Sequence, residues 1–324
     1  MERALAVVAY DIGSENFRFL RSLFPEVEFQ LCLDAASVAA AAPRMEILFS
    51  KALFPEALAA AHRLRWVQAG TAGVESWLRM GLHERGVRLS SATGAHGVPI
   101  AEQTIGMMLA FSSGLHTLIR NQVLPAGTDP REIAHAVIRE KLELEGRTVC
   151  IIGLGDIGGT LARKCRGLGM QVTGVNRSGS HVDGVDELLP ASEIPAAIAR
   201  ADHVALCLPS TALTDRIVGE PELRVMKPTA FIYNTGRGAA IDPDALIRAL
   251  RERWIAGAGL DVTEPEPLPV DSPLRTMPNV ILGAHTGGSS PLNSDRITRI
   301  FVANLRRYLA GEPLSGEVHA GRGY

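Results

Sequence analysis

Three strand-like runs in the second half of the chain end in polar residues suited to the reduction of a carbonyl group. TAFIYNTG is followed by Arg237, AGAGLDV contains Asp261, and NVILGAH ends in His285. Because ligands of parallel sheets bind at the carboxyl ends of the strands, these side chains are expected at one edge of a sheet. A histidine donates a proton near neutral pH, and an arginine holds a carboxylate and polarises a carbonyl group.

Two further carboxylates, Glu264 and Glu266, follow in the turn TEPEP. A carboxylate bonded to one ring nitrogen of a histidine fixes its tautomer and stabilises its charged form. The spacing alone leaves either glutamate open as the partner of His285. Taken singly, His285 is as readily a loop histidine and Arg237 a solvated charge, so the joint placement at successive strand ends carries the prediction. The glycines on both sides of Arg237 are expected to leave its guanidinium unshielded.

A glycine-rich loop, IIGLGDIGG, lies upstream of these strand ends. Gly153, Gly155 and Gly158 form G-x-G-x-x-G between a strand-like run and a helical pattern. The first glycine permits a tight turn, the second lets a pyrophosphate approach the backbone, and the third allows close packing of the helix on the strand. The helix N-terminus then offers N–H groups to the phosphates. This context predicts a dinucleotide site.

The segment VTGVNRSGS (172–180) lies where an acidic residue would bind the adenosine ribose, yet it offers Asn176, Arg177 and Ser178. A carboxylate at this position would repel the 2′-phosphate of NADP, whereas the neutral asparagine does not. The arginine and serine can donate hydrogen bonds to that phosphate. We therefore expect NADP to be preferred and NAD to be possible. The alternative is that Arg177 is a solvated loop residue and that the site takes NAD.

Strand-like runs alternate with helical patterns, which predicts an α/β fold with two doubly wound parallel sheets. A long helix is expected from about Pro99, and a last helix over about 291–310 with Ser290 as N-cap. The expected strands cover 3–11, 27–33, 45–50, 64–68 and 87–90 in the first unit, and 147–153, 170–175, 203–209, 229–236, 256–262 and 279–285 in the second.

Composition narrows the function classes. The 324 residues suffice for two domains, and the net charge of −2 gives no general attraction to nucleic acid or to anionic membranes. The first apolar run (4–10) is short for a signal peptide, so a cytoplasmic protein is expected. The four cysteines show no metal-ligand spacing and are expected to be buried and reduced, so no metal site is predicted.

The order glycine loop, Arg, Asp, Glu, His resembles that of the D-isomer-specific 2-hydroxyacid dehydrogenase family. NTGRG is similar to the family's Asn-Thr-Ala-Arg-Gly, GLDVTEPEPLP to Leu-Asp-Val-Phe-x-x-Glu-Pro-Leu, and AHTGG to Pro-His-x-(Gly/Ala)-(Gly/Ala). VQAGTAGVESWL, IAEQTIGMMLAF and the closing VHAGRGY extend the resemblance over nearly the whole chain. Ala284 departs from the usual Pro and Gly236 from the usual Ala, and PREIAHAVIREKLELEG stands where a Gly-x-Trp segment often packs at a dimer interface.

The resemblance implies a Rossmann coenzyme domain (99–288) inserted in a flavodoxin-like substrate domain (1–98 plus 289–324), with the cofactor in the cleft between them. It implies transfer of a hydride from NAD(P)H to a 2-keto acid, giving a D-2-hydroxy acid, in a homodimer. Specificity for one keto acid is not readable from these motifs. An alternative of another class is a dinucleotide-sensing regulatory module, because co-repressors of this superfamily share the fold.

The resemblance also assigns roles by position. His285 becomes the general acid/base, Glu266 its partner because it lies five residues after Asp261, and Arg237 the substrate-orienting cation. Asp261 is implied to contact the nicotinamide carboxamide, and Pro209 to back the nicotinamide ring. The substrate-binding set is Thr71, Ala72, Gly73, Arg237 and His285. The cofactor-binding set is Gly153, Gly155, Asp156, Ile157, Gly158, Asn176, Arg177, Ser178, Pro209, Thr235 and Asp261.

Overall fold

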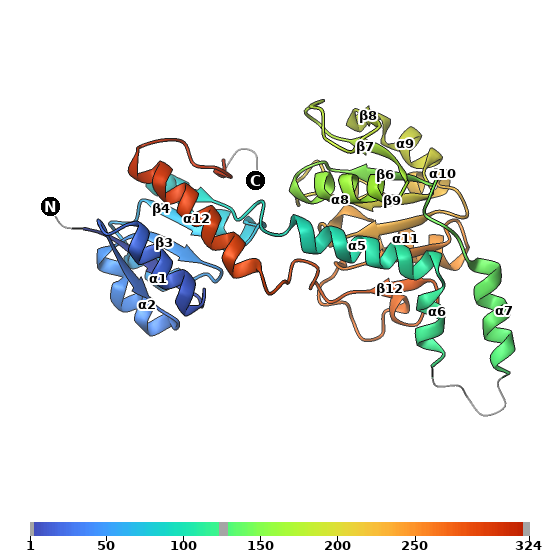
Figure 1. Cartoon of the computed structure of the whole chain (residues 1–324), viewed down its shortest axis with the longest axis horizontal. Coiled ribbons are helices and arrows are strands. Elements are labelled where there is room, and N and C mark those ends of the chain that lie inside the picture. The colour runs from blue at the N-terminus through green and yellow to red at the C-terminus, as the bar shows by residue number, and fades with distance from the viewer. Residues whose placement is uncertain (1–2, 123–128, 320–324) are drawn as a thin grey trace. The chain divides into compact units, whose positions relative to one another are not determined.

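The computed structural model describes residues 3–122 and 129–319. The chain forms two compact units: Met1–His96 together with Ser290–Tyr324, and Gly97–Ser289. Each unit is built on a parallel sheet flanked by helices (Figure 1), so the predicted α/β fold class is confirmed. We call them, in this order, the first and the second unit.

The boundaries predicted from the sequence, and the substrate and coenzyme roles given to the two parts, stay predictions. Part of the closing motif VHAGRGY lies outside the described residues. Within the described ranges, no helix combines the length and the apolar character needed to cross a bilayer. The same ranges hold no group of three or more His, Cys, Asp or Glu side chains arranged to bind a metal ion.

The first unit contains a five-stranded sheet in the order β2-β1-β3-β4-β5, with every neighbouring pair parallel. This order is that of flavodoxin-like doubly wound sheets. The strand order reverses between β1 and β3, so connections leave these two strands toward opposite sides. The strands are β1 (Ala4–Val8), β2 (Val27–Leu31), β3 (Met45–Ser50), β4 (Trp66–Ala69) and β5 (Arg88–Ser90).

Helices cover both faces of this sheet because successive strand residues point to opposite sides. Leu5 and Val7 of β1 pack with α2, α3 and α4, while Ala6 and Val8 pack with α1 and α12. On the second face, the Phe301 ring of α12 stacks on Phe49 and Trp66. The helices are α1 (Ser14–Leu23), α2 (Ala35–Ala41), α3 (Pro55–Ala60), α4 (Glu75–Leu78) and α12 (Asn293–Leu309).

The second unit contains a seven-stranded parallel sheet in the order β12-β11-β10-β9-β6-β7-β8. The order reverses between β6 and β9, as in dinucleotide-binding folds. Six of the strands were predicted; β8 was missed because it is a three-residue edge strand without an apolar run. The strands are β6 (Thr148–Ile152), β7 (Gln171–Val175), β8 (Glu187–Leu189), β9 (His203–Leu206), β10 (Phe231–Asn234), β11 (Gly257–Leu260) and β12 (Val280–Leu282).

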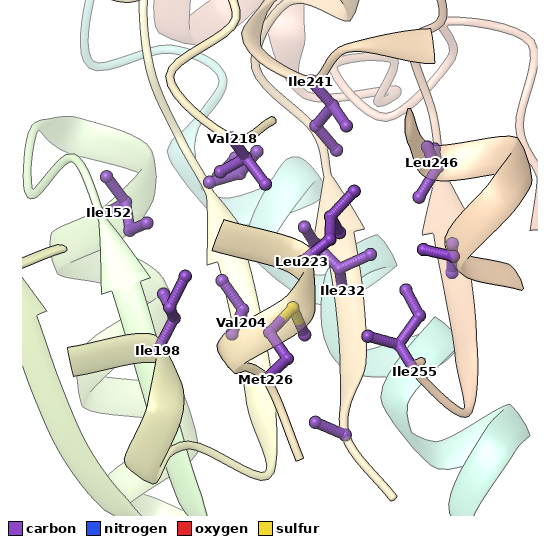
Figure 2. Close-up of a cluster of buried hydrophobic side chains, with 14 of the residues drawn as sticks. Ile152, Ile198, Val204, Val218, Leu223, Met226, Ile232, Ile241, Leu246 and Ile255 are labelled. Atoms are coloured by element: carbon purple, nitrogen blue, oxygen red, sulfur yellow. The ribbon is translucent and has the colours of Figure 1, made fainter. Parts of the chain in front are cut away.

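Two apolar layers bury this sheet. One joins β6, β9, β10 and β11 to α9, α10 and α11, and Figure 2 shows Ile198, Leu223 and Leu246 of these helices pointing toward Val204 and Ile232 of the strands. The other layer lies under α5 and α8. The helices are α5 (Gly97–Ser112), α6 (Leu115–Arg120), α7 (Pro130–Glu140), α8 (Asp156–Gly167), α9 (Ile194–Arg200), α10 (Glu220–Val225) and α11 (Pro243–Arg251).

The two predicted helices lie where they were expected, but the length of the first and the N-cap of the second were wrong. The long helix expected from about Pro99 is interrupted, because Gly114 adopts a left-handed conformation (φ 73°) and ends α5. The last helix begins at Asn293, and the Ser290 hydroxyl accepts a hydrogen bond from the N–H of Leu292 in the preceding turn. Ser290 therefore shapes the turn that leads into α12 and does not cap it.

All four cysteines are buried and free, as expected. Burial raises the pKa of the Cys150, Cys165 and Cys207 thiols to about 12. The neutral thiol is a weak nucleophile, so these side chains act as small apolar core residues.

Candidate active site

The three predicted strand ends meet at one edge of the second sheet. Strands β10, β11 and β12 are parallel neighbours, and Asn234, Leu260 and Leu282 stand in register at their carboxyl ends. Arg237 follows β10, Asp261 follows β11 directly, and His285 lies three residues beyond β12. The parallel order therefore carries these three residues to the same edge, as the sequence predicted.

His285 and Glu266 are in contact. The ring Nδ1 lies 2.5 Å from Glu266 Oε1, and the two side chains are 51% and 41% exposed. A carboxylate at Nδ1 places the proton there in the neutral ring, so the opposite nitrogen, Nε2, is the one that exchanges protons with a ligand. The choice of Glu266 over Glu264 thus agrees with the geometry, and the role of the pair in catalysis remains a proposal.

Asp261 braces the turn that carries His285. Its side chain is 5% exposed, Oδ1 accepts from the N–H of Thr286 (3.1 Å), and Oδ2 accepts from the N–H of Gly287 (2.9 Å). Its backbone carbonyl accepts from the N–H of His285 (2.9 Å). His285 has a φ of 54°, a left-handed conformation that a side chain disfavours unless its surroundings impose it. These three hydrogen bonds supply that constraint.

Gln103 completes this brace and was not singled out from the sequence. Its Nε2 donates to Asp261 Oδ1 over 2.9 Å from the first half of α5. Its only sequence signal is a polar residue inside the apolar helical pattern PIAEQTIGMML, which does not reveal its partner. The predicted contact of Asp261 with a nicotinamide carboxamide stays a prediction, while its hydrogen bonds give it a role in positioning His285.

The glycines flanking Arg237 are required by the packing of the backbone, and the expectation that they leave the guanidinium unshielded stays a prediction. A Cβ at Gly236 would lie 2.7 Å from the carbonyl oxygen of Leu208, and one at Gly238 would overlap the carbonyl of Thr263. The loop after β10 is thus clamped between the loops after β9 and β11. Asn234, 1% exposed, donates to the Arg237 carbonyl over 2.8 Å and fixes the turn.

The phosphate loop has the geometry that its glycines predict. Gly153 adopts φ 95°, and a Cβ there would lie 2.6 Å from the carbonyl oxygen of Cys207. A Cβ at Gly158 would overlap the Gly153 carbonyl oxygen, whereas one at Gly155 would meet no atom within 4 Å. The first and third glycines are therefore required by packing, and Gly155 leaves open space at the start of α8. These residues fit a dinucleotide pyrophosphate.

Helix α8 begins at Asp156, followed by Ile157. Its N-cap residue is Gly155, which has no side chain to accept a hydrogen bond from the first N–H groups. The uncapped end suits an anion, because the first N–H groups of a helix have no partner within it. The Asp156 carboxylate lies against Gly97 at the start of α5, where a Cβ would approach it to 2.6 Å.

The turn after β7 is shaped by its own side chains. Asn176 Oδ1 accepts from the N–H of Gly179 (2.8 Å), and its Nδ2 donates to the carbonyl of Ser180 (3.1 Å). The Ser178 hydroxyl accepts from the N–H of Ser180. Arg177 is exposed at the tip. Asn176 therefore organises the turn that presents Arg177, a role that its sequence position alone does not indicate.

Two other predicted cofactor contacts lie in different surroundings. Pro209 is exposed beyond the carboxyl end of β9. Thr235 is 5% exposed, and its hydroxyl accepts a hydrogen bond from Thr104 of α5 over 3.3 Å. Thr235 thus ties the end of β10 to α5, and its contact with a cofactor stays a prediction.

The predicted substrate loop belongs to the first unit and follows β4. The Thr71 hydroxyl donates to the carbonyl of Gly73 (2.8 Å), and the Thr71 carbonyl accepts from the N–H of Ala92 (2.9 Å). Thr71, Ala72 and Gly73 are each partly exposed. The loop is therefore held in a defined conformation at the carboxyl edge of the first sheet.

Comparison with known proteins places this geometry in a family. The model of the NAD-binding domain of D-isomer specific 2-hydroxyacid dehydrogenases matches residues 105–287. A protein of Corynebacterium melassecola named for the proB 3′ region is 32% identical over 86% of this chain and 90% of its own length. A glyoxylate reductase of Korarchaeum cryptofilum is 37% identical, over 55% of this chain and 54% of its own length.

Solved structures give the same result. A D-isomer specific 2-hydroxyacid dehydrogenase family protein from Aeromonas salmonicida aligns over 98% of this chain and all of its own, with a TM-score of 0.85 and 29% identity. The Xanthobacter autotrophicus D-isomer specific 2-hydroxyacid dehydrogenase, in complex with NADPH and MES, aligns over both complete chains with a TM-score of 0.79 and 26% identity. The chain therefore belongs to the D-isomer specific 2-hydroxyacid dehydrogenase family, whose members are nicotinamide-dinucleotide-dependent oxidoreductases.

Proposed function

We propose that this protein reduces a 2-keto acid to the D-2-hydroxy acid, with His285 as the proton donor. The observation that carries the proposal is the 2.5 Å contact between His285 Nδ1 and Glu266 at the sheet edge where Arg237 also lies. The second unit, with its phosphate loop, is the proposed coenzyme domain, and the first unit is the proposed substrate domain.

The proposed chemistry divides between the cofactor and the chain. A bound reduced nicotinamide supplies the hydride that the carbonyl carbon accepts. His285 delivers a proton from Nε2 to the carbonyl oxygen, while the Glu266 carboxylate at Nδ1 holds the ring in place and stabilises its charged form. Arg237 binds the substrate carboxylate and polarises the carbonyl. The backbone N–H groups of Thr71, Ala72 and Gly73 are proposed to hold the same carboxylate.

A panel of 2-keto acids tested with both reduced cofactors examines this function. Oxidation of the cofactor by at least one keto acid, with a product of D configuration, is the expected result. A protein that binds the cofactor but turns over no 2-keto acid would instead be a dinucleotide-sensing module. An L product would contradict the proposed D configuration.

Replacement of Glu266 by glutamine is expected to lower kcat by about 10²-fold, because the amide no longer stabilises the charged imidazole ring. Glu264→Gln is the matched control, since Glu264 lies in the same turn and, within the described part of the chain, makes no hydrogen bond or ion pair with His285. Steady-state kinetics on the best keto acid measures both. Equal effects of the two substitutions would remove Glu266 from the mechanism.

NADP is the proposed preferred cofactor, supported by the exposed Arg177 on the turn that Asn176 shapes. Arg177→Ala is expected to lower kcat/KM for NADPH by about 10- to 100-fold and to change the value for NADH little, because only NADPH carries the phosphate. Arg251→Ala, another exposed arginine of the second unit, is the control. A wild-type protein that prefers NADH would overturn the assignment.

We also propose a cytoplasmic homodimer. The α6 and α7 helices pack together (Figure 1). Ile119 of α6 is 61% exposed, and Ile138 of α7 is 68% exposed. Exposed large apolar side chains on two packed helices are typical of a contact surface between subunits.

A further inference from the structure

The first sheet has its own topological switch point, between β1 and β3. Ligands of open parallel sheets bind outside the carboxyl ends of strands where the order reverses, because the diverging connections leave room there. Tyr10 lies two residues after β1, and Lys51 follows β3 directly. Neither residue lies in the stretches that carry the family resemblance, such as VQAGTAGVESWL and NTGRG.

Lys51 is held in place by contacts on two sides. Its Nζ lies 4.9 Å from the centre of the Tyr10 ring, a cation–π distance, and the Tyr10 ring packs edge-on against Phe49 of β3. Its stem fills the place that a side chain at residue 70 would take, because a Cβ at Gly70 would lie 2.6 Å from Lys51 Cγ. The lysine is therefore directed across the switch point.

The ammonium group of Lys51 has no opposite charge near it. Within residues 3–122 and 129–319, no carboxylate lies within ion-pair distance of Nζ, yet the residue is exposed. Packing around the stem lowers the pKa of Lys51. A cation that is fixed, reachable and without a counter-charge is suited to an anionic ligand.

The neighbouring loop indicates which anion. Gly70, which admits the Lys51 stem, donates to the carbonyl of Ser50 over 2.7 Å and leads directly into Thr71, Ala72 and Gly73. These are the residues proposed to hold the substrate carboxylate. If this loop holds the carboxylate next to the keto group, the side chain of the keto acid lies near Lys51.

We propose that Lys51, supported by the Tyr10 ring, forms a subsite for a second anionic group, a carboxylate or a phosphate, on the side chain of the 2-keto acid. The inference rests on the proposed function and narrows its substrate class from 2-keto acids in general to dianionic ones. Lys51 is then a specificity-determining residue, and Arg237 and His285 act on the part that all 2-keto acids share.

The test compares Lys51→Met with the wild type on five keto acids. Glyoxylate and pyruvate carry one anionic group, oxaloacetate and 2-oxoglutarate carry a second carboxylate at two distances, and 3-phosphohydroxypyruvate carries a phosphate. The ratio of kcat/KM for the best dianionic substrate to that for glyoxylate is expected to fall by about 10- to 100-fold, the loss of one charge-assisted hydrogen bond. Arg251→Met, at an exposed arginine of the second unit, controls for net charge.

Two substitutions of Tyr10 separate its ring from its hydroxyl. The hydroxyl is buried and has no hydrogen-bond partner within the described part of the chain, and burial raises its pKa well above the ordinary range. Tyr10→Phe keeps the ring and is expected to keep the substrate ratio, whereas Tyr10→Leu removes the ring and lowers the ratio in the same direction as Lys51→Met.

The outcomes are distinguishable. Equal losses on glyoxylate and on all dianionic substrates would mean that Lys51 binds the shared carboxylate, and a changed Tm with an unchanged ratio would mean a structural role; either overturns the subsite. Preference for the carboxylate or the phosphate substrate identifies the anion. Turnover of glyoxylate alone, with dianionic acids refused, contradicts the subsite but leaves the proposed function standing. Absence of turnover on every keto acid contradicts both.

Discussion

Replacement of His285 by alanine is expected to lower kcat for 2-keto acid reduction by about 10²- to 10⁴-fold, the usual contribution of a positioned general acid. Nε2 of His285 is the proposed proton donor, and the ring is held by the 2.5 Å contact between its Nδ1 and Glu266 Oε1. A water molecule that fills the space in the alanine variant has no such contact to orient it. Steady-state kinetics on the best keto acid gives kcat, and fluorescence of the bound reduced nicotinamide gives the cofactor Kd. The Kd is expected to change little, because no part of the phosphate loop is altered.

His62→Ala is the matched control for this substitution, since His62 is an exposed histidine of the first unit and belongs to none of the proposed catalytic or binding sets. Its kcat is expected to equal that of the wild type. Unimpaired reduction of every accepted keto acid by the His285 variant would show that the proton comes from another group, and the proposed mechanism would be wrong.

Replacement of Gly158 by alanine is expected to destabilise the second unit by about 3 kcal/mol or more and to abolish cofactor binding. The added Cβ would overlap the carbonyl oxygen of Gly153, so either α8 or the loop must move. For a unit of this size the change corresponds to a fall in Tm of about 6–12 °C. Thermal unfolding and cofactor titration measure the two effects.

Gly155→Ala separates folding from binding. A Cβ at Gly155 meets no atom within 4 Å, so the free energy of unfolding is expected to change by less than about 0.5 kcal/mol. The same Cβ would stand where the pyrophosphate approaches, so the cofactor Kd is expected to rise more than 10-fold, by about 1.4 kcal/mol or more. Gly167→Ala, also in open space but at the far end of α8, is expected to leave both unchanged. A Gly155 variant that binds the cofactor normally would rule out the phosphate loop.

The sequence was most informative where local pattern decides the structure. Arg237, Asp261 and His285 were placed at one sheet edge because parallel strands bring their carboxyl ends together, and the register of β10, β11 and β12 confirms that placement. The G-x-G-x-x-G turn likewise follows from backbone sterics that only glycine satisfies.

Contacts between residues far apart in the sequence could not be predicted from the sequence. Gln103 and Asp261 are 158 residues apart, and neither carries a mark of its partner. The close neighbours of the glycines beside Arg237, Leu208 and Thr263, belong to other loops, so the sequence did not reveal that packing requires these glycines. Ser290 has the residue type of an N-cap, yet its hydroxyl is used by the turn before α12.

The hydrogen bond between Gln103 and Asp261 has a consequence for variants selected by function. One carboxylate joins an early turn of α5 to the turn that carries His285, so the proposed acid–base group is aligned partly from within a helix. Substitutions at residue 103 are therefore expected to change turnover through the placement of His285. In a library selected for new activity, that helix position is a tuning point that a map of ligand contacts would overlook.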